Sequence, residues 1–172
     1  MRLLSIIFFV VMCVIIDKVT GAEIKVFAKQ VKTKIFPGQN LLSAKTPITD
    51  GDNIIWHKSF ATDVLFFGGE AQYNEGNIVK TVKLDWNEGI DICEEVDDGS
   101  LFDLAGQLLR KSWLPLGSCP VNKGSFKAKN PFGPTDVSVS QKSHRYVFKL
   151  QVGFSRDQLV FETEYYVQLA GQ

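Results

Sequence analysis

The stretch HRYVFKLQVGFSRDQLVFETEYYVQL, residues 144–169, decides the fold class because apolar and polar residues alternate along both of its halves. A period of two is typical of β-strands that bury one face. The two apolar rows are Tyr146, Phe148, Leu150, Val152 and Phe154, then Leu159, Phe161, Thr163, Tyr165, Val167 and Leu169. A hairpin with an even loop, of four residues or a tight two, puts both rows on one side. The expected pairs are Phe154 with Leu159, Val152 with Phe161, and Phe148 with Tyr165.

Shorter segments of the same kind precede this hairpin. We expect a short first strand at residues 23–29, a loop at 37–53 with a short edge strand near Leu41-Leu42, a strand pair or one bent strand from Ile54 that Gly68-Gly69 breaks, and a strand from Ile78 to Trp86 after a turn at 74–77. Each strand would have one apolar and one polar face.

One segment has a different period. In GSLFDLAGQLLRKSW, residues 99–113, the apolar positions Leu101, Leu104, Ala105, Leu108 and Leu109 recur at helical spacing. Asp97, Asp98 or Ser100 can cap the start of this helix, and Pro115 prevents its continuation. The sequence therefore predicts an all-β fold, an antiparallel two-sheet β-sandwich, with one short helix inserted across one end.

The N-terminus indicates the compartment. An apolar run from Leu3 to Ile16 follows the cation Arg2 and ends in small residues near Gly21. This is the layout of a secretory signal peptide, and the run is too short for a membrane span of about 20 residues. We expect a signal peptide at residues 1–21, one domain at 22–172, and a secreted, extracellular, monomeric protein.

Removal of that signal would leave two cysteines, Cys93 and Cys119. Three roles compete for them: disulfide, metal ligand and nucleophile. In an oxidising compartment two remaining thiols most simply pair, on either side of the predicted helix. The metal role lacks ligands, because zinc prefers four Cys or His and only His57 and His144 are present. Nothing in the sequence marks the base that a nucleophile would need.

Charge and motifs argue against other classes of function. The chain after residue 21 would carry 17 basic and 18 acidic residues without a basic stripe, so nucleic acid is not an expected partner. The sequence has no nucleophile elbow, phosphate-binding loop or pair of metal-binding histidines. We therefore expect no catalytic residue, no metal ligand and no cofactor.

Residues around the cysteines resemble a known family. Ile90-Asp91-Ile92-Cys93, the helix at 101–109 and CPVNKGSF at 119–126 are similar in order and context to the ML lipid-recognition superfamily. The likeness is to its GM2-activator branch and to the insect chemosensory CheA/CheB-type proteins. It extends over residues 78–170, where Pro131 and Pro134 and the closing hairpin also fit.

This resemblance implies an immunoglobulin-like cup that holds a lipid or another hydrophobic ligand between its sheets. GM2-activator proteins carry several disulfides, whereas this chain can form one. That departure favours the cysteine-poor insect relatives, whose suggested role is to bind or present hydrophobic cues such as pheromones.

We derive a candidate binding site from the inward rows and the loop after the helix. The wall would be Phe148, Leu150, Val152, Phe161 and Tyr165, with Phe126 and Trp86 opposite, and the lip would be Trp113, Leu114 and Leu116. The expected partners are a small hydrophobic ligand and a receptor or membrane surface. The alternative is an extracellular interaction or receptor-accessory module, in which the same aromatic rows are filled core.

Overall fold

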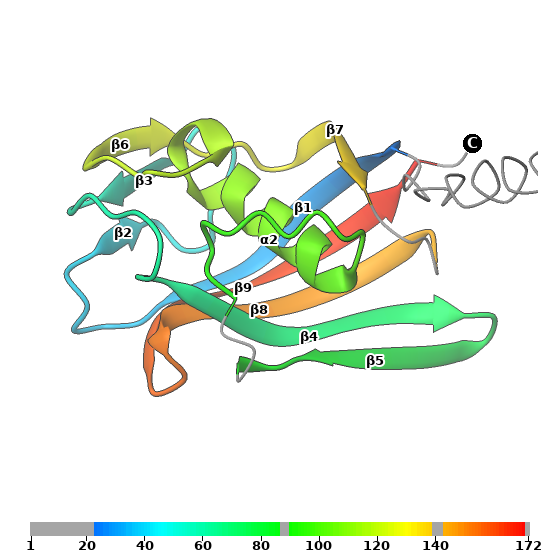
Figure 1. The fold of residues 1–172 in the computed structure, drawn as a ribbon. Coiled ribbons are helices and arrows are strands. Elements are labelled where there is room, and N and C mark those ends of the chain that lie inside the picture. Colours follow the sequence, from blue (N-terminus) through cyan, green and yellow to red (C-terminus); the bar gives the residue numbers. More distant parts are fainter. Residues whose placement is uncertain (1–22, 87–89, 139–142, 171–172) are drawn as a thin grey trace, which may run out of the picture.

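The computed structural model describes residues 23–86, 90–138 and 143–170 and consists mainly of β-strands. The elements are β1 (Glu23–Ile35), β2 (Leu42–Ala44), β3 (Asn53–Trp56), β4 (Phe66–Glu75), β5 (Ile78–Leu84), α2 (Leu101–Trp113), a 3₁₀ turn (Pro115–Gly117), β6 (Gly124–Lys127), β7 (Phe132–Ser138), β8 (Arg145–Ser155) and β9 (Gln158–Leu169). They form two antiparallel sheets, of six strands in the order β5-β4-β8-β9-β1-β7 and of three in the order β2-β3-β6 (Figure 1). The predicted all-β sandwich is confirmed.

The closing hairpin has the predicted register over most of its length. Val152 pairs with Phe161 and Phe148 with Tyr165, and the strands are joined by a tight turn of two residues, Arg156 and Asp157. The expected pair of Phe154 with Leu159 is wrong. The register shifts on both sides of Gly153, and this irregularity turns Phe154 toward solvent.

Two strands of the six-stranded sheet, β1 and β4, differ from the prediction in their extent. β1 continues to Ile35 instead of ending near residue 29, with a register shift between Gln30 and Lys32. The expected break at Gly68-Gly69 is also wrong, because both glycines lie inside β4. A Cβ on Gly69 would clash with the backbone oxygen of Lys149 on β8, so this position of β4 requires glycine.

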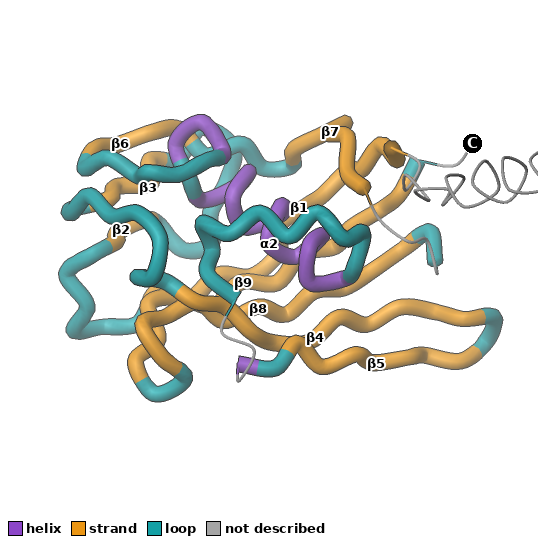
Figure 2. Tube along the Cα trace, in the orientation of Figure 1, coloured by secondary structure: helices purple, strands orange, loops and turns teal. Residues whose placement is uncertain are grey.

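The helix forms where the sequence predicted it along the chain, but it does not pack against the predicted end of the sandwich. α2 begins after Ser100, whose hydroxyl accepts a hydrogen bond from the backbone N–H of Asp103, and it ends before Pro115. It crosses the inner face of the six-stranded sheet and does not lie over one end of the sandwich (Figure 2). The wide apolar face of α2 explains this position, since the inner sheet face offers it the most buried area.

A disulfide joins the segments on either side of α2. Cys93 and Cys119 are bonded, with their Cα atoms 5.6 Å apart, as the sequence predicted. Single β-bridges hold both segments: Asp91 pairs with Phe66 at the start of β4, and Val121 pairs with Phe60 in the loop between β3 and β4. The signal peptide predicted at residues 1–21 lies outside the described residues. No helix of the described part of the chain is long and apolar enough to cross a membrane.

Candidate functional site

The five residues predicted as the wall of a cavity are buried, and other side chains of the protein cover them. Each of these residues points inward from β8 or β9 and has at most 1% of its surface exposed: Phe148, Leu150, Val152, Phe161 and Tyr165. Trp113 of α2 stacks on Phe161 with ring centroids 4.1 Å apart. The space between the sheets at this point is therefore occupied by the protein's own aromatic rings.

A buried hydrogen-bond network fixes this packing. The hydroxyl of Tyr165 lies 2.5 Å from the Ser112 hydroxyl and accepts a hydrogen bond from Trp113 Nε1 at 3.1 Å. Trp56 Nε1 donates to the backbone oxygen of Trp113 at 2.9 Å. Burial raises the pKa of Tyr165 far above its usual value, so its hydroxyl remains protonated and able to donate.

Two predicted site residues, Trp113 and Trp86, do not lie where the sequence suggested. Trp113 was expected at the lip, but it is fully buried beneath it. Trp86 was expected opposite the wall, but its indole lies against Gly68, within 3 Å of where a Cβ would be. Gly68 is in register with Gln151 and alternates with the inward Phe67, so Trp86 lies on the outer face of the sheet.

Three remaining candidates meet at a surface groove, which we call the helix-end groove. Its volume is about 670 Å³, and it lies between the end of α2, β6 and the start of β7. Its lining includes the predicted Leu114, Leu116 and Phe126, and it is completed by Asp50, Lys111, Ser112, Gly117, Lys127, Lys129, Pro131, Phe132, Gly133 and Pro134.

The floor of the helix-end groove is aromatic and rests on the core. Phe126 and Phe132 are both half-buried, and the ring of Phe132 meets that of Tyr165 edge to face at 6.4 Å. The groove is thus separated from the predicted wall by one layer of side chains. Phe132 is the main residue that the sequence analysis missed, because it stands in a proline-rich stretch without alternation.

Leu116 is the most exposed large apolar side chain of the described residues. Its exposed fraction is 101%, and its φ of 63° is in the left-handed region that leucine rarely adopts. Pro115 and Gly117 flank it, and the N–H of Gly117 donates to the Leu114 oxygen at 3.0 Å. The tight turn therefore holds an apolar side chain in water at the edge of the groove.

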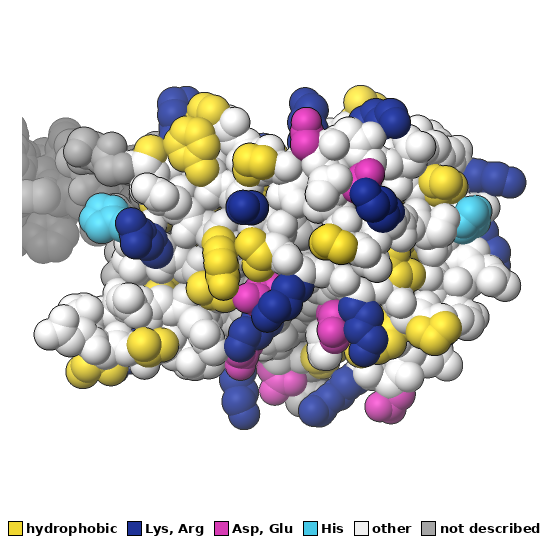
Figure 3. All heavy atoms as spheres, turned by 180° about the vertical axis from the view of Figure 1, so that it is seen from behind, with side chains coloured by type: hydrophobic (Ala, Val, Ile, Leu, Met, Phe, Trp, Pro, Cys, Tyr) yellow, Lys and Arg dark blue, Asp and Glu magenta, His cyan; other side chains and the backbone are white. Residues whose placement is uncertain are grey.

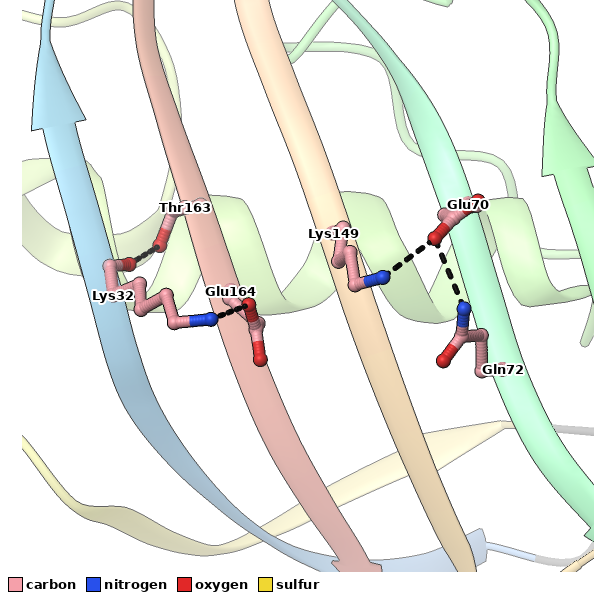
Figure 4. Close-up of polar contacts among 6 residues, drawn as sticks. All are labelled: Lys32, Glu70, Gln72, Lys149, Thr163 and Glu164. Atoms are coloured by element: carbon pink, nitrogen blue, oxygen red, sulfur yellow. Dashed lines mark hydrogen bonds and ion pairs between the residues drawn. The ribbon is translucent and has the colours of Figure 1, made fainter.

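A second groove, of about 700 Å³, crosses the outer face of the six-stranded sheet. Four charged residues are paired side by side across neighbouring strands of this sheet. They are Lys32 of β1, Glu164 of β9, Lys149 of β8 and Glu70 of β4. These lysines and glutamates form ion pairs of 3.0 and 2.8 Å, and Gln72 donates to Glu70 (Figure 4). Basic and acidic side chains lie side by side over the middle of this face (Figure 3), as on a solvated surface.

A polar cluster of Arg110, Asp103 and Gln107 lies where α2 contacts the segment that precedes it. The guanidinium of Arg110 is buried and donates to the backbone oxygen of Glu94 at 2.5 Å. Asp103 is also buried; its Oδ1 accepts from Gln107, and its Oδ2 has no hydrogen-bond partner in the structure. Burial raises the pKa of Asp103. The hydrogen bond from Arg110 attaches the segment that carries Cys93 to the helix.

No cluster within the described ranges contains three or more His, Cys, Asp or Glu side chains in positions to hold a metal ion. His57 Nε2 lies 2.9 Å from the Ser43 hydroxyl on the surface. Comparison with known proteins gave no match, either to a family model or to a curated protein. The resemblance to the ML superfamily therefore stays a prediction from the sequence.

Proposed function

We propose that this protein is a secreted binding protein for a small hydrophobic ligand, and that the ligand lies in the helix-end groove. The groove carries the proposal: it has an aromatic floor, an exposed leucine at its edge and a volume of about 670 Å³, within the range of small-molecule sites. The disulfide is compatible with secretion. The sequence resemblance to lipid-recognition proteins points in the same direction.

The physical basis of binding is burial of apolar surface. Leu116 is fully exposed, and Phe126 and Phe132 are half-buried, so all three can lose contact with water when an apolar ligand covers them. At about 25 cal/mol per Å², 200 Å² of apolar surface removed from water corresponds to about 5 kcal/mol before the costs of binding. The core beneath the groove need not open.

A second candidate function is an extracellular interaction or receptor-accessory module. The closed packing of Trp113 on Phe161 favours it, because the space between the sheets is filled at this point. In that case the exposed Leu116 would contact a protein partner and not a ligand.

Native mass spectrometry of the protein secreted from eukaryotic cells, before and after organic extraction, tests the proposal. We expect a bound apolar species that extraction removes. The extracted protein should then bind the fluorescent probe N-phenyl-1-naphthylamine, and Leu116→Ser should weaken this binding about tenfold through lost apolar contact.

The control is Ile78→Ser, which removes another exposed apolar side chain, 61% exposed, at the start of β5 and away from the residues that line the groove. It should leave probe binding unchanged. An apo mass together with no probe binding would contradict the proposal and favour the interaction module. The same spectra give the signal cleavage site.

A further inference from the structure

We propose that the ligand of the helix-end groove is an amphiphile with one apolar chain and an anionic head group, held by the lysines at the edge of the groove. This inference rests on the proposed function and adds the chemistry of the ligand. Three lysines from three segments border the groove: Lys111 from the last turn of α2, Lys127 from β6 and Lys129 from the segment that follows.

These lysines form no ion pair with an acidic side chain of the described residues. The ion pairs found among the described residues involve other lysines, on β1, β5, β8 and the loop before β3. Asp50 is the one acidic residue in the lining, and its Oδ1 accepts a hydrogen bond from the backbone N–H of Asn130 at 3.3 Å. The groove therefore has an excess of positive charge in a chain whose formal net charge is +0.

The groove on the outer sheet face provides an internal comparison. It is lined by three lysines and three glutamates, and Lys32 and Lys149 are paired with Glu164 and Glu70. There the protein neutralises its own charges. At the helix-end groove the positive charges stand unpaired beside apolar side chains, and charge complementarity calls for an anion next to an apolar group.

The three lysines should not contribute equally. The carbonyl end of α2 carries a partial negative charge, which Lys111 in the last turn offsets. Lys127 and Lys129 have no helix end to compensate. We therefore expect them to supply most of the attraction for the head group, while Phe126, Phe132 and Leu116 contact the chain.

Isothermal titration calorimetry of the extracted, full-length secreted protein tests the inference with three probes that share one chain: hexadecanoic acid, hexadecyl phosphate and hexadecanol, each below its aggregation threshold. The carboxylate and the phosphate should bind about tenfold more tightly than the alcohol at low salt. Raising the salt to about 0.5 M should reduce this difference, because ions screen exposed charges.

Two double variants of equal charge change complete the experiment. K127Q/K129Q should weaken binding of both anionic probes about fivefold or more and leave hexadecanol unchanged. The control, K29Q/K83Q, removes two exposed lysines of the six-stranded sheet that do not line this groove and should change nothing. A smaller effect of K111Q than of K127Q would support the role assigned to the helix end.

The outcomes separate the two proposals. Equal binding of all three probes, unaffected by K127Q/K129Q, would overturn the head-group inference and leave the hydrophobic-ligand function standing. A preference for the phosphate alone would restrict the head group to phosphate esters and support the inference. No binding of any probe would overturn both.

Discussion

Tyr165 was predicted to line a cavity, but its hydroxyl binds the helix that fills this space. Its position on the inward row of β9 follows from alternation alone. The sequence does not reveal that its hydroxyl meets Ser112 and Trp113 of α2, because these contacts depend on where the helix packs. The hydroxyl group of Tyr165 therefore links the helix to the sheet by hydrogen bonds, in addition to the stacking of Trp113 on Phe161.

Tyr165→Phe should lower the free energy of unfolding by about 1–3 kcal/mol. The substitution keeps the ring and leaves the buried Trp113 Nε1 and Ser112 hydroxyl without this partner, which is the costly case for hydrogen bonds in a core. Urea unfolding followed by tryptophan fluorescence measures the change. The neighbouring Tyr166→Phe is the control, since Tyr166 is about half exposed on the other face of the same strand. Equal stabilities of the two variants would contradict the role of the network.

At the scale of elements, the sequence was most informative where one period runs without interruption. The helix was predicted from five apolar positions and a cap, and the hairpin was predicted from its two apolar rows. The extension of β1 was missed because residues 29–34 are mostly polar, although the strand pairs with β9 throughout. The two glycines of β4 were predicted to break the strand because glycine often does so. In the structure they leave room for Trp86 and for the backbone of Lys149, and the local sequence does not reveal these neighbours.

The candidate site was predictable to a similar degree. Leu114 and Leu116 stand out as apolar residues bounded by proline and glycine, and both line the helix-end groove. Phe132 and the lysines were not identified, since they come together only when β6 and β7 are placed beside the end of α2. The face on which Trp86 lies was not predictable either, because it depends on the glycine at position 68 of the neighbouring strand.

The disulfide and α2 form one structural unit, and its loss should affect stability and binding together. C93S/C119S should lower the free energy of unfolding by about 3 kcal/mol, because the bond closes a loop over a sequence separation of 26. Probe affinity should also fall, since Cys119 follows the turn that holds Leu116. Denaturation and probe titration with and without reductant measure both. Unchanged affinity after reduction would show that the turn keeps its conformation without the bond.

For the whole molecule, the distribution of charge distinguishes two surfaces. The outer sheet face alternates basic and acidic side chains and pairs most of them, whereas the helix-end groove keeps its lysines unpaired. Exposed ion pairs contribute little to stability, so the paired face is mainly a solvated surface. The lysines border the groove that also carries Leu116, the most exposed large apolar side chain of the described residues. The coincidence of these two features, and not either one alone, is the reason why we propose the groove as the binding site.

In the interior of the molecule, the carboxylate of Asp103 should make stability depend on pH. Asp103 is buried with an unpartnered Oδ2, and burial raises its folded-state pKa above the usual value of 3.8. Its protonated form is therefore favoured by folding, and its contribution to stability decreases as pH rises through and above 3.8. The hydrogen bond from Gln107, the backbone N–H of Gly99 and the positive charge of Arg110 oppose this shift, and the charge of Asp98 adds to it.

Asp103→Asn removes this titration at nearly constant size. The stability of the variant relative to the wild type should therefore increase from pH 3.5 to pH 7, as measured by urea unfolding at fixed ionic strength. The control is Asp136→Asn, which replaces an exposed carboxylate paired with Lys25 and should change the free energy of unfolding by less than about 1 kcal/mol. A difference between Asp103→Asn and wild type that stays constant over this range would mean that Asp103 ionises in the folded protein as it does in the unfolded chain. In that case the helix and the segment preceding it would admit water around this carboxylate.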